Sequence, residues 1–314
     1  MKSKLTLALV MGTLFAIQPL LGCSEPDSNA VLEPDVSAKS SDVAASPQTP
    51  QVQGSDKKSS ATAATKAADT ESAEGNWGHL TGTVIVDGDV PAAAVEAAAG
   101  HQDEAVCKVD GEIPVDDKIV VNPENKGLRD VYVVMYLKKK KTDLVHPDYA
   151  SKKEEAVVLD NVNCRFVPHA AFVRTGQKLI IKNSDAVGHN CKISTFNNEI
   201  NPNIPANSQV EATFDLEDSL LGEVTCAMHP WMDSVIFIRD NPYVAVTDAD
   251  GKFTIENLPE GEWEFQFMHK QVGFLKKLTI ENYKVSRKGV TTAKISNGET
   301  TDLGTMKFPA KSFK

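Results

Sequence analysis

A seven-residue stretch, Cys226-Ala227-Met228-His229-Pro230-Trp231-Met232, places a thiol, an imidazole and a thioether close together in the chain. A second imidazole lies well upstream, in Asn183-Ser184-Asp185-Ala186-Val187-Gly188-His189-Asn190. One Cys, two His and a weakly bound Met form a ligand set that suits copper, because sulfur and imidazole donors prefer soft and borderline ions. The chain must therefore fold so that these two distant segments meet.

Both segments resemble the ligand regions of the cupredoxin family, and the Cys-x2-His-x2-Met spacing is most similar to the amicyanin type. The resemblance covers roughly residues 157–240 and implies a Greek-key β-sandwich that holds one mononuclear copper ion. It implies three trigonal ligands and one axial ligand, namely His189, Cys226, His229 and Met232. Asn183 and Asn190 belong to the same Asn-x5-His-Asn segment, and the resemblance gives them supporting roles. Asn190 is expected to tie the two ligand segments together and to shield the thiolate with its backbone N–H.

The axial ligand is the weakest of these assignments, because a Met more often fills a core than binds a metal. Met228 is a competing sulfur, but it is adjacent to His229 and badly placed for a joint site. In the family, the histidine on the Cys loop lies near the surface and is the usual electron exit, inside an apolar patch. Pro230, Trp231 and Met228 are candidates for that patch, although packing at the sandwich end explains Trp231 equally well.

The remaining histidines have no partner at ligand spacing, and we expect them to be core or surface residues. They are His79, His101, His146, His169 and His269.

The first residues have the pattern of an export signal. Lys2 and Lys4 precede an apolar stretch over residues 5–21, and Leu20-Leu21-Gly22-Cys23 resembles a bacterial lipobox. This predicts a lipoprotein signal peptide over residues 1–22 and a lipid on Cys23, with an ordinary signal peptide as the alternative. Ser24 in place of Asp favours the outer membrane, so the expected location is the cell envelope. Residues 23–76 lack aromatic and periodic apolar residues, which predicts a disordered tether.

The exported compartment permits disulfides, and three cysteines remain besides Cys23 and Cys226. We favour a bond between Cys107 and Cys164, because Cys191 lies two residues after His189, in a strand beside the metal. Three reduced, buried thiols are the alternative.

A second pattern flanks the cupredoxin-like region. Residues 244–255 read as strand, Asp-Gly turn and strand, and Leu258-Pro259-Glu260-Gly261 follows. These motifs resemble the carboxypeptidase-regulatory-like, or transthyretin-like, sandwich, as does a Gly-x-Val strand at residues 82–84. The expected fold is therefore all-β, with residues 77–155 and 241–314 forming a second small sandwich around an inserted cupredoxin at 156–240. A single enlarged sandwich and two consecutive domains dividing near Pro242 are the alternatives, and pairing of residues 80–86 with residue 244 or later favours the split.

The charge balance limits the partners. The net charge of −10 argues against nucleic acid. Lys138–Lys141 is either a docking patch for an acidic partner or, as we favour, a solvated loop that blunts a sheet edge. The expected function is that of a one-electron carrier, not an enzyme, with an unidentified redox partner and a membrane reached through the lipid. Copper handling without a redox role, and a surface structural or adhesion module with a vestigial metal loop, are the alternatives.

Overall fold

The structure is a computed structural model, and it describes residues 76–90, 98–113, 116–136 and 144–313. The expected signal peptide, the lipid site at Cys23, the tether up to residue 75 and the run Lys138–Lys141 lie outside these residues. Among the residues described, no helix is long and apolar enough to cross a bilayer.

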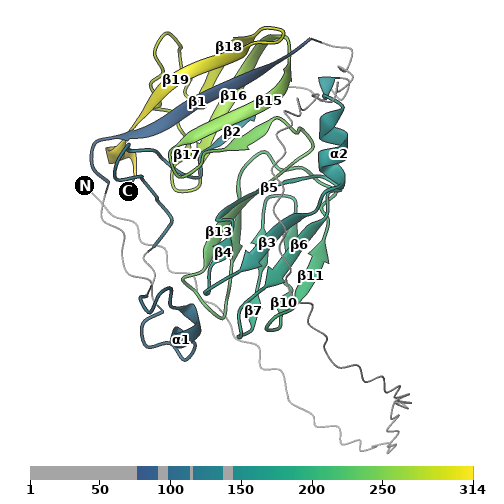
Figure 1. Cartoon of the computed structure of the whole chain (residues 1–314), viewed down its shortest axis with the longest axis vertical. Helices are drawn as coiled ribbons and strands as arrows, with labels where there is room; N and C mark the ends of the chain where they lie inside the picture. The colour runs from purple at the N-terminus through teal and green to yellow at the C-terminus, as the bar shows by residue number, and fades with distance from the viewer. Residues whose placement is uncertain (1–75, 91–97, 114–115, 137–143, 314) are drawn as a thin grey trace, which may run out of the picture. The chain divides into compact units, whose positions relative to one another are not determined.

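The protein is nearly all-β, which confirms the predicted fold class. Strands on both sides of the cupredoxin-like region in sequence build one sandwich, which we call the outer sandwich (Figure 1). Its strands are β1 (Trp77–Asp87), β2 (Tyr132–Met135), β14 (Val244–Val246), β15 (Lys252–Pro259), β16 (Gly261–His269), β17 (Gly273–Phe274), β18 (Val290–Ile295) and β19 (Thr300–Pro309). A 3₁₀ turn, Ala310–Ser312, follows β19.

The order of strands in this sandwich shows how the chain is threaded. One sheet has the order β15-β1-β19, with β1 antiparallel to β15 and parallel to β19. The other sheet has the order β14-β2-β16-β17, and β18 pairs with β16. The first strand of the described chain thus pairs with strands that follow residue 244, as the split arrangement requires; the exact boundaries at 155/156 and 240/241 stay a prediction.

The predicted Asp-Gly turn before β15 explains one close approach between these strands. Gly251 has φ +74°, and a Cβ at this position would collide with the backbone oxygen of Val84 in β1. Glycine is therefore the residue that lets the β14–β15 turn lie against β1.

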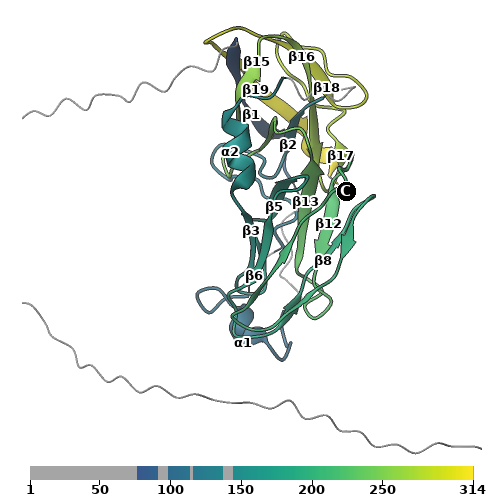
Figure 2. The same cartoon turned by 90° about the vertical axis from the view of Figure 1, so that its right-hand side faces the viewer.

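The residues between the two halves form a second sandwich, which we call the ligand sandwich. Its sheets have the orders β11-β6-β3-β4 and β5-β13-β12-β8-β9, and β7 pairs with β10. Figure 2 shows the two sheets face to face. The strands are β3 (Val157–Asn161), β4 (Phe166–Val167), β5 (Ala170–Arg174), β6 (Leu179–Asn183), β7 (His189–Asn190), β8 (Lys192–Ser194), β9 (Glu199–Ile200), β10 (Asn203–Ile204), β11 (Gln209–Ala212), β12 (Gly222–Thr225) and β13 (Asp233–Arg239). Two short helices lie outside the sheets, α1 (Glu104–Cys107) and α2 (Asp148–Glu154).

Strands β2 and β13 are buried on both faces, and this joins the two sandwiches. Alternate residues of a strand point to opposite faces, so Ile236 packs in the core of the ligand sandwich while Phe237 faces the other way. Phe237 packs with Tyr132 of β2 in a separate apolar cluster. The Tyr132 hydroxyl also donates a hydrogen bond of 2.8 Å to the carbonyl of Ala171 in β5.

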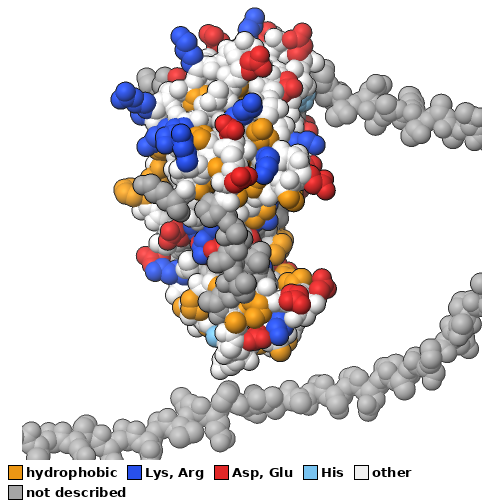
Figure 3. All heavy atoms as spheres, turned by 90° about the vertical axis from the view of Figure 1, so that its left-hand side faces the viewer, with side chains coloured by type: hydrophobic (Ala, Val, Ile, Leu, Met, Phe, Trp, Pro, Cys, Tyr) orange, Lys and Arg blue, Asp and Glu red, His pale blue; other side chains and the backbone are white. Residues whose placement is uncertain are grey.

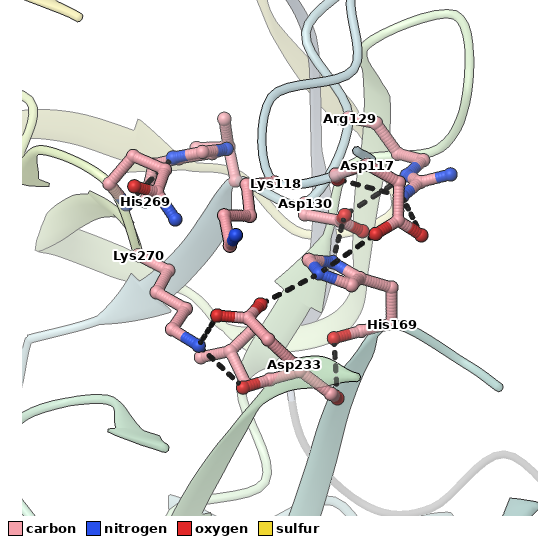
Figure 4. Close-up of polar contacts among 12 residues, drawn as sticks. Asp117, Lys118, Arg129, Asp130, His169, Asp233, His269 and Lys270 are labelled. Atoms are coloured by element: carbon pink, nitrogen blue, oxygen red, sulfur yellow. Dashed lines mark hydrogen bonds and ion pairs between the residues drawn. The ribbon is translucent and has the colours of Figure 1, made fainter. Parts of the chain in front are cut away.

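A cluster of charged residues completes this junction (Figure 4). His169, which precedes β5, lies with its Nδ1 2.7 Å from Oδ2 of Asp130, which precedes β2. Lys270, which follows β16, reaches Oδ2 of Asp233 at 2.7 Å, at the start of β13. Burial alone would lower the pKa of His169, but the hydrogen bond with Asp130 and the nearby carboxylates of Asp233 and Asp117 raise it to about 9. His169 is therefore a charged residue that links the two sandwiches.

The outer surface carries charges of both signs. On the face drawn in Figure 3, Lys and Arg side chains are interspersed with Asp and Glu side chains.

Candidate metal centre

The two segments predicted to hold the ligands meet at one end of the ligand sandwich. β12 ends one residue before Cys226, and β13 begins one residue after Met232. The loop between them is closed by its own backbone, because the N–H of Met232 donates to the carbonyl of His229 at 2.9 Å. His189 lies in β7, which pairs with β10.

Three of the predicted ligand atoms surround a common point. The sulfur of Cys226 lies 3.9 Å from Nδ1 of His189 and 3.8 Å from Nδ1 of His229. These atoms lie within 4.8 Å of one another, and all three residues are buried. Bonds of about 2.3 Å to sulfur and about 2.0 Å to nitrogen, roughly 120° apart, would span about 3.7 Å. The donor spacing therefore fits one first-row metal ion.

A carboxylate lies behind each imidazole. Nε2 of His189 is 2.8 Å from Oδ2 of Asp185, and Nε2 of His229 is 3.1 Å from Oδ2 of Asp103. With Nε2–H donated to a carboxylate, the Nδ1 lone pair of each ring is directed to the sulfur side, as a metal ligand requires. The sequence analysis assigned a role to neither carboxylate. Asp185 lies within residues 183–190, close to His189, whereas no motif near Asp103 indicates a contact with a metal ligand.

Asn190 links the two ligand segments. Its side-chain oxygen accepts a hydrogen bond of 2.7 Å from the N–H of Ala227, in the Cys loop. Its backbone N–H is also one of the groups that hydrogen-bond the Cys226 sulfur and lower the pKa of the thiol. The link between the two ligand segments is the one expected from the family resemblance, and the shielding of the thiolate by the N–H of Asn190 stays a prediction.

Asn183 organises the loop that leads to His189. Its side-chain N–H groups donate to the carbonyls of Val187 at 2.8 Å, Ile204 at 3.0 Å and Pro205 at 3.0 Å. Its side-chain oxygen accepts the N–H of Asp185 at 3.0 Å. Asn183 thus supports the segment that carries both His189 and its carboxylate.

The two methionines of the Cys loop have different environments. Met232 is 1% exposed and packs in the same core as Cys226, whereas Met228 is 43% exposed. Burial beside Cys226 is compatible with the predicted axial role of Met232. Met228 instead lies at the surface, with its sulfur over Gly188.

The electrostatics of the site favour a thiolate. Burial alone would raise the pKa of Cys226, but hydrogen bonding with the side chains of His189 and His229 and with backbone N–H groups lowers it to about 5. Burial alone would lower the pKa of His189, but Asp185 and the Cys226 sulfur raise it to about 9. Cys191 differs, since burial raises its pKa to about 12, which leaves it a neutral thiol. The site therefore favours the ionised form of one cysteine only.

His229 is not at the surface, and in this respect the expectation of an exposed electron exit is wrong. Its side chain is 0% exposed. Residues 98–107, which we call the cap segment, lie at the same end of the ligand sandwich as β7 and β10 (Figure 1). His101 of this segment contacts both His229 and Trp231, with ring centroids 5.2 Å and 5.0 Å apart. His101, which had no ligand spacing in the sequence, thus covers the second imidazole.

A disulfide between Cys107 and Cys164 ties the cap segment to the ligand sandwich, and this is the pairing that the sequence favoured. Cys164 lies in the turn between β3 and β4, and both Asn163 and Cys164 have positive φ. Asp185 accepts the N–H groups of Asn163 at 2.7 Å and Cys164 at 2.9 Å. The carboxylate that supports His189 therefore also holds the turn that carries the disulfide.

No protein-family model matches this chain, and no curated protein matches it. Solved structures with partial similarity include a Cu-containing nitrite reductase (NirK) from Thermus scotoductus SA-01, with 15% identity and a TM-score of 0.25 over 33% of this chain and 25% of that one. A mutant of amicyanin in its reduced Cu(I) form at pH 4 has 16% identity and a TM-score of 0.24, over 34% of this chain and 97% of that one. A purple cupredoxin from Nitrosopumilus maritimus has 20% identity and a TM-score of 0.23, over 26% and 97%. We therefore base the assignment of a metal on the donor atoms described above.

Proposed function

We propose that this protein binds one copper ion through His189, Cys226, His229 and Met232 and carries single electrons. The observation that supports this most is the placement of the Cys226 sulfur 3.8 and 3.9 Å from two imidazole nitrogens, each backed by a carboxylate. Bound copper would supply a Cu(I)/Cu(II) couple. The protein would bind no substrate at the metal and would need a redox partner.

The surroundings suit electron transfer because they hold the ligands in place. All three donor residues are buried. Each imidazole is held by a carboxylate, and the residue that follows Cys226 donates its N–H to Asn190. Ligands that are held in advance move little when the charge of the metal changes. Burial also favours retention of copper over its delivery to another protein, so the structure supports an electron carrier more than a copper-handling role.

Because His229 is buried, electrons cannot pass directly from its ring edge to a partner and need another route to the surface. His229, His101 and Trp231 form a set of rings in mutual edge contact, with centroids 5.0–5.2 Å apart. His101 and Trp231 are half-buried. In our proposal electrons enter and leave through these two rings.

We place this function in the cell envelope, with the protein anchored by a lipid on Cys23. The support is the lipobox-like sequence alone. Mass spectrometry of the mature N-terminus tests it, and an unmodified Cys23 in the mature chain would contradict it.

The visible and EPR spectra of copper-loaded protein test the proposed function. We expect an intense thiolate-to-copper band in the wild type, its loss in Cys226→Ser, and its retention in Cys191→Ser. Cys191 is a matched control because it is a second buried, free thiol. The same spectrum in wild type and Cys226→Ser would show that the proposed ligand is wrong, and absence of reversible oxidation and reduction would favour copper handling.

A further inference from the structure

We propose that Asp103 is a positioning residue for His229, and that the cap segment is therefore a part of the metal site on which copper retention and reduction potential depend. This inference rests on the proposed function. It assigns a role to a segment that precedes the ligand sandwich in the chain and carries none of the four predicted ligands.

Asp103 contacts the ring of His229 in the same way as Asp185 contacts the ring of His189. Asp185 holds Nε2 of His189 at 2.8 Å from within the ligand segment, and Asp103 holds Nε2 of His229 at 3.1 Å from 126 residues away. No residue of the loop 226–232 hydrogen-bonds Nε2 of His229, so this nitrogen is held by Asp103. The orientation of His229 thus depends on a residue outside the sandwich.

Local contacts fix Asp103 in its place. Its own N–H donates to Nδ1 of His101 at 3.2 Å, and its carbonyl accepts the N–H of Cys107 at 3.1 Å. The adjacent Glu104 accepts the N–H of Gly100 at 2.6 Å and pairs with Lys108 at 2.8 Å. These bonds make the cap segment a compact turn that presents one carboxylate to His229.

The disulfide anchors this turn beside both histidines. Cys107 lies four residues after Asp103, and its partner Cys164 donates its N–H to Asp185. The sulfurs of Cys107 and Cys164 lie within 4.8 Å of a ring nitrogen of His229. One covalent bond thus connects the segment that carries Asp103 to a turn that is hydrogen-bonded to Asp185. Positive φ at a cysteine is uncommon, and unusual backbone conformations of this kind cluster at functional sites.

The consequence for a bound metal follows from charge. A carboxylate that accepts Nε2–H increases the electron density that the imidazole offers to the metal through Nδ1. The more highly charged Cu(II) gains more from this than Cu(I), so Asp103 lowers the reduction potential and strengthens Cu(II) binding.

The test compares Asp103→Ala and Asp103→Asn with Glu112→Gln in the full chain. Glu112 is an exposed carboxylate in the residues that follow the cap segment, so its variant controls for the loss of a charge. Copper(II) affinity is measured by competition with a chelator, and the reduction potential by voltammetry. We expect Asp103→Ala to bind Cu(II) about 10- to 100-fold more weakly and to have a higher potential. Asp103→Asn keeps a neutral acceptor and should be intermediate.

A measurement without copper separates positioning from general stability. Imidazole nitrogen NMR of the metal-free protein reports which nitrogen of His229 carries the proton. We expect Nε2–H in the wild type and in Glu112→Gln, and a mixture of tautomers in Asp103→Ala. Equal affinity, potential and tautomer in Asp103→Ala and Glu112→Gln would overturn the inference. Failure of the wild type to bind copper would instead contradict the proposed function.

Discussion

At the scale of single residues, the ligand atoms are held by side chains that have no motif of their own. Asp185 is 6% exposed and serves two purposes, since it accepts from the His189 ring and from the backbone of the turn at Asn163 and Cys164. A buried acceptor with several donors is costly to neutralise, because each donor loses a charged partner. The stability of the metal-free protein and the geometry of the metal site therefore depend on the same carboxylate.

Replacing Asp185 by Asn should lower the free energy of unfolding of the metal-free protein by about 2 kcal/mol. In the wild type these donors share a charged carboxylate with two oxygens, whereas Asn would offer them one neutral oxygen. Urea denaturation measures the loss, and Asp215→Asn, an exposed carboxylate on the same sandwich, is the control. Equal midpoints for the two variants would show that Asp185 is not structurally important.

At the scale of elements, the short α1 and the β3–β4 turn act together through one disulfide. α1 has no hydrophobic face that would fix its position, because Cys107 is the only buried residue that it contributes. The bond joins residues that are 57 apart in sequence, so it restricts a large part of the unfolded chain. In physical terms the disulfide replaces a core that the cap segment is too small to form.

The double variant Cys107→Ser/Cys164→Ser should lose about 4 kcal/mol of stability in the chain-entropy description. Thermal unfolding of the metal-free protein measures the loss. The variant should also make His229 accessible, which faster modification of this residue by diethylpyrocarbonate would show. Unchanged protection of His229 would mean that the cap segment stays closed without the bond.

At the scale of the whole described molecule, the two sandwiches are joined by an apolar seam and by the charged cluster around His169. Tyr132 and Phe237 form the apolar part, and His169 lies between carboxylates from both sandwiches. Burial lowers the pKa of His269 to about 4, so this neighbouring histidine stays neutral. Of His169 and His269, only His169 is charged at neutral pH and forms ion pairs between the two sandwiches.

The pKa of His169 is raised to about 9 in the folded protein, from an ordinary value near 6.5. Its stabilising contribution is therefore complete below about pH 6.5 and is lost as the pH rises through about 9. The shift corresponds to about 3 kcal/mol. We expect the difference in unfolding free energy between wild type and His169→Gln to shrink from pH 6 to pH 10, measured by urea denaturation at each pH. A difference that is constant with pH would contradict a charged His169.

The sequence by itself determined the all-β fold class and the local half of the metal site. Cys226, His229 and Met232 lie on one short loop, so their spacing alone restricts where their donor atoms lie, and Asn190 follows His189 directly. Only the tertiary structure decided which distant residues approach this loop. The parallel pairing of β1 with β19, the burial of His229 and the contact of Asp103 across 126 residues leave no periodic signal in the chain. Strand patterns report which face of an element is apolar, whereas the meeting of loops depends on how whole sheets pack.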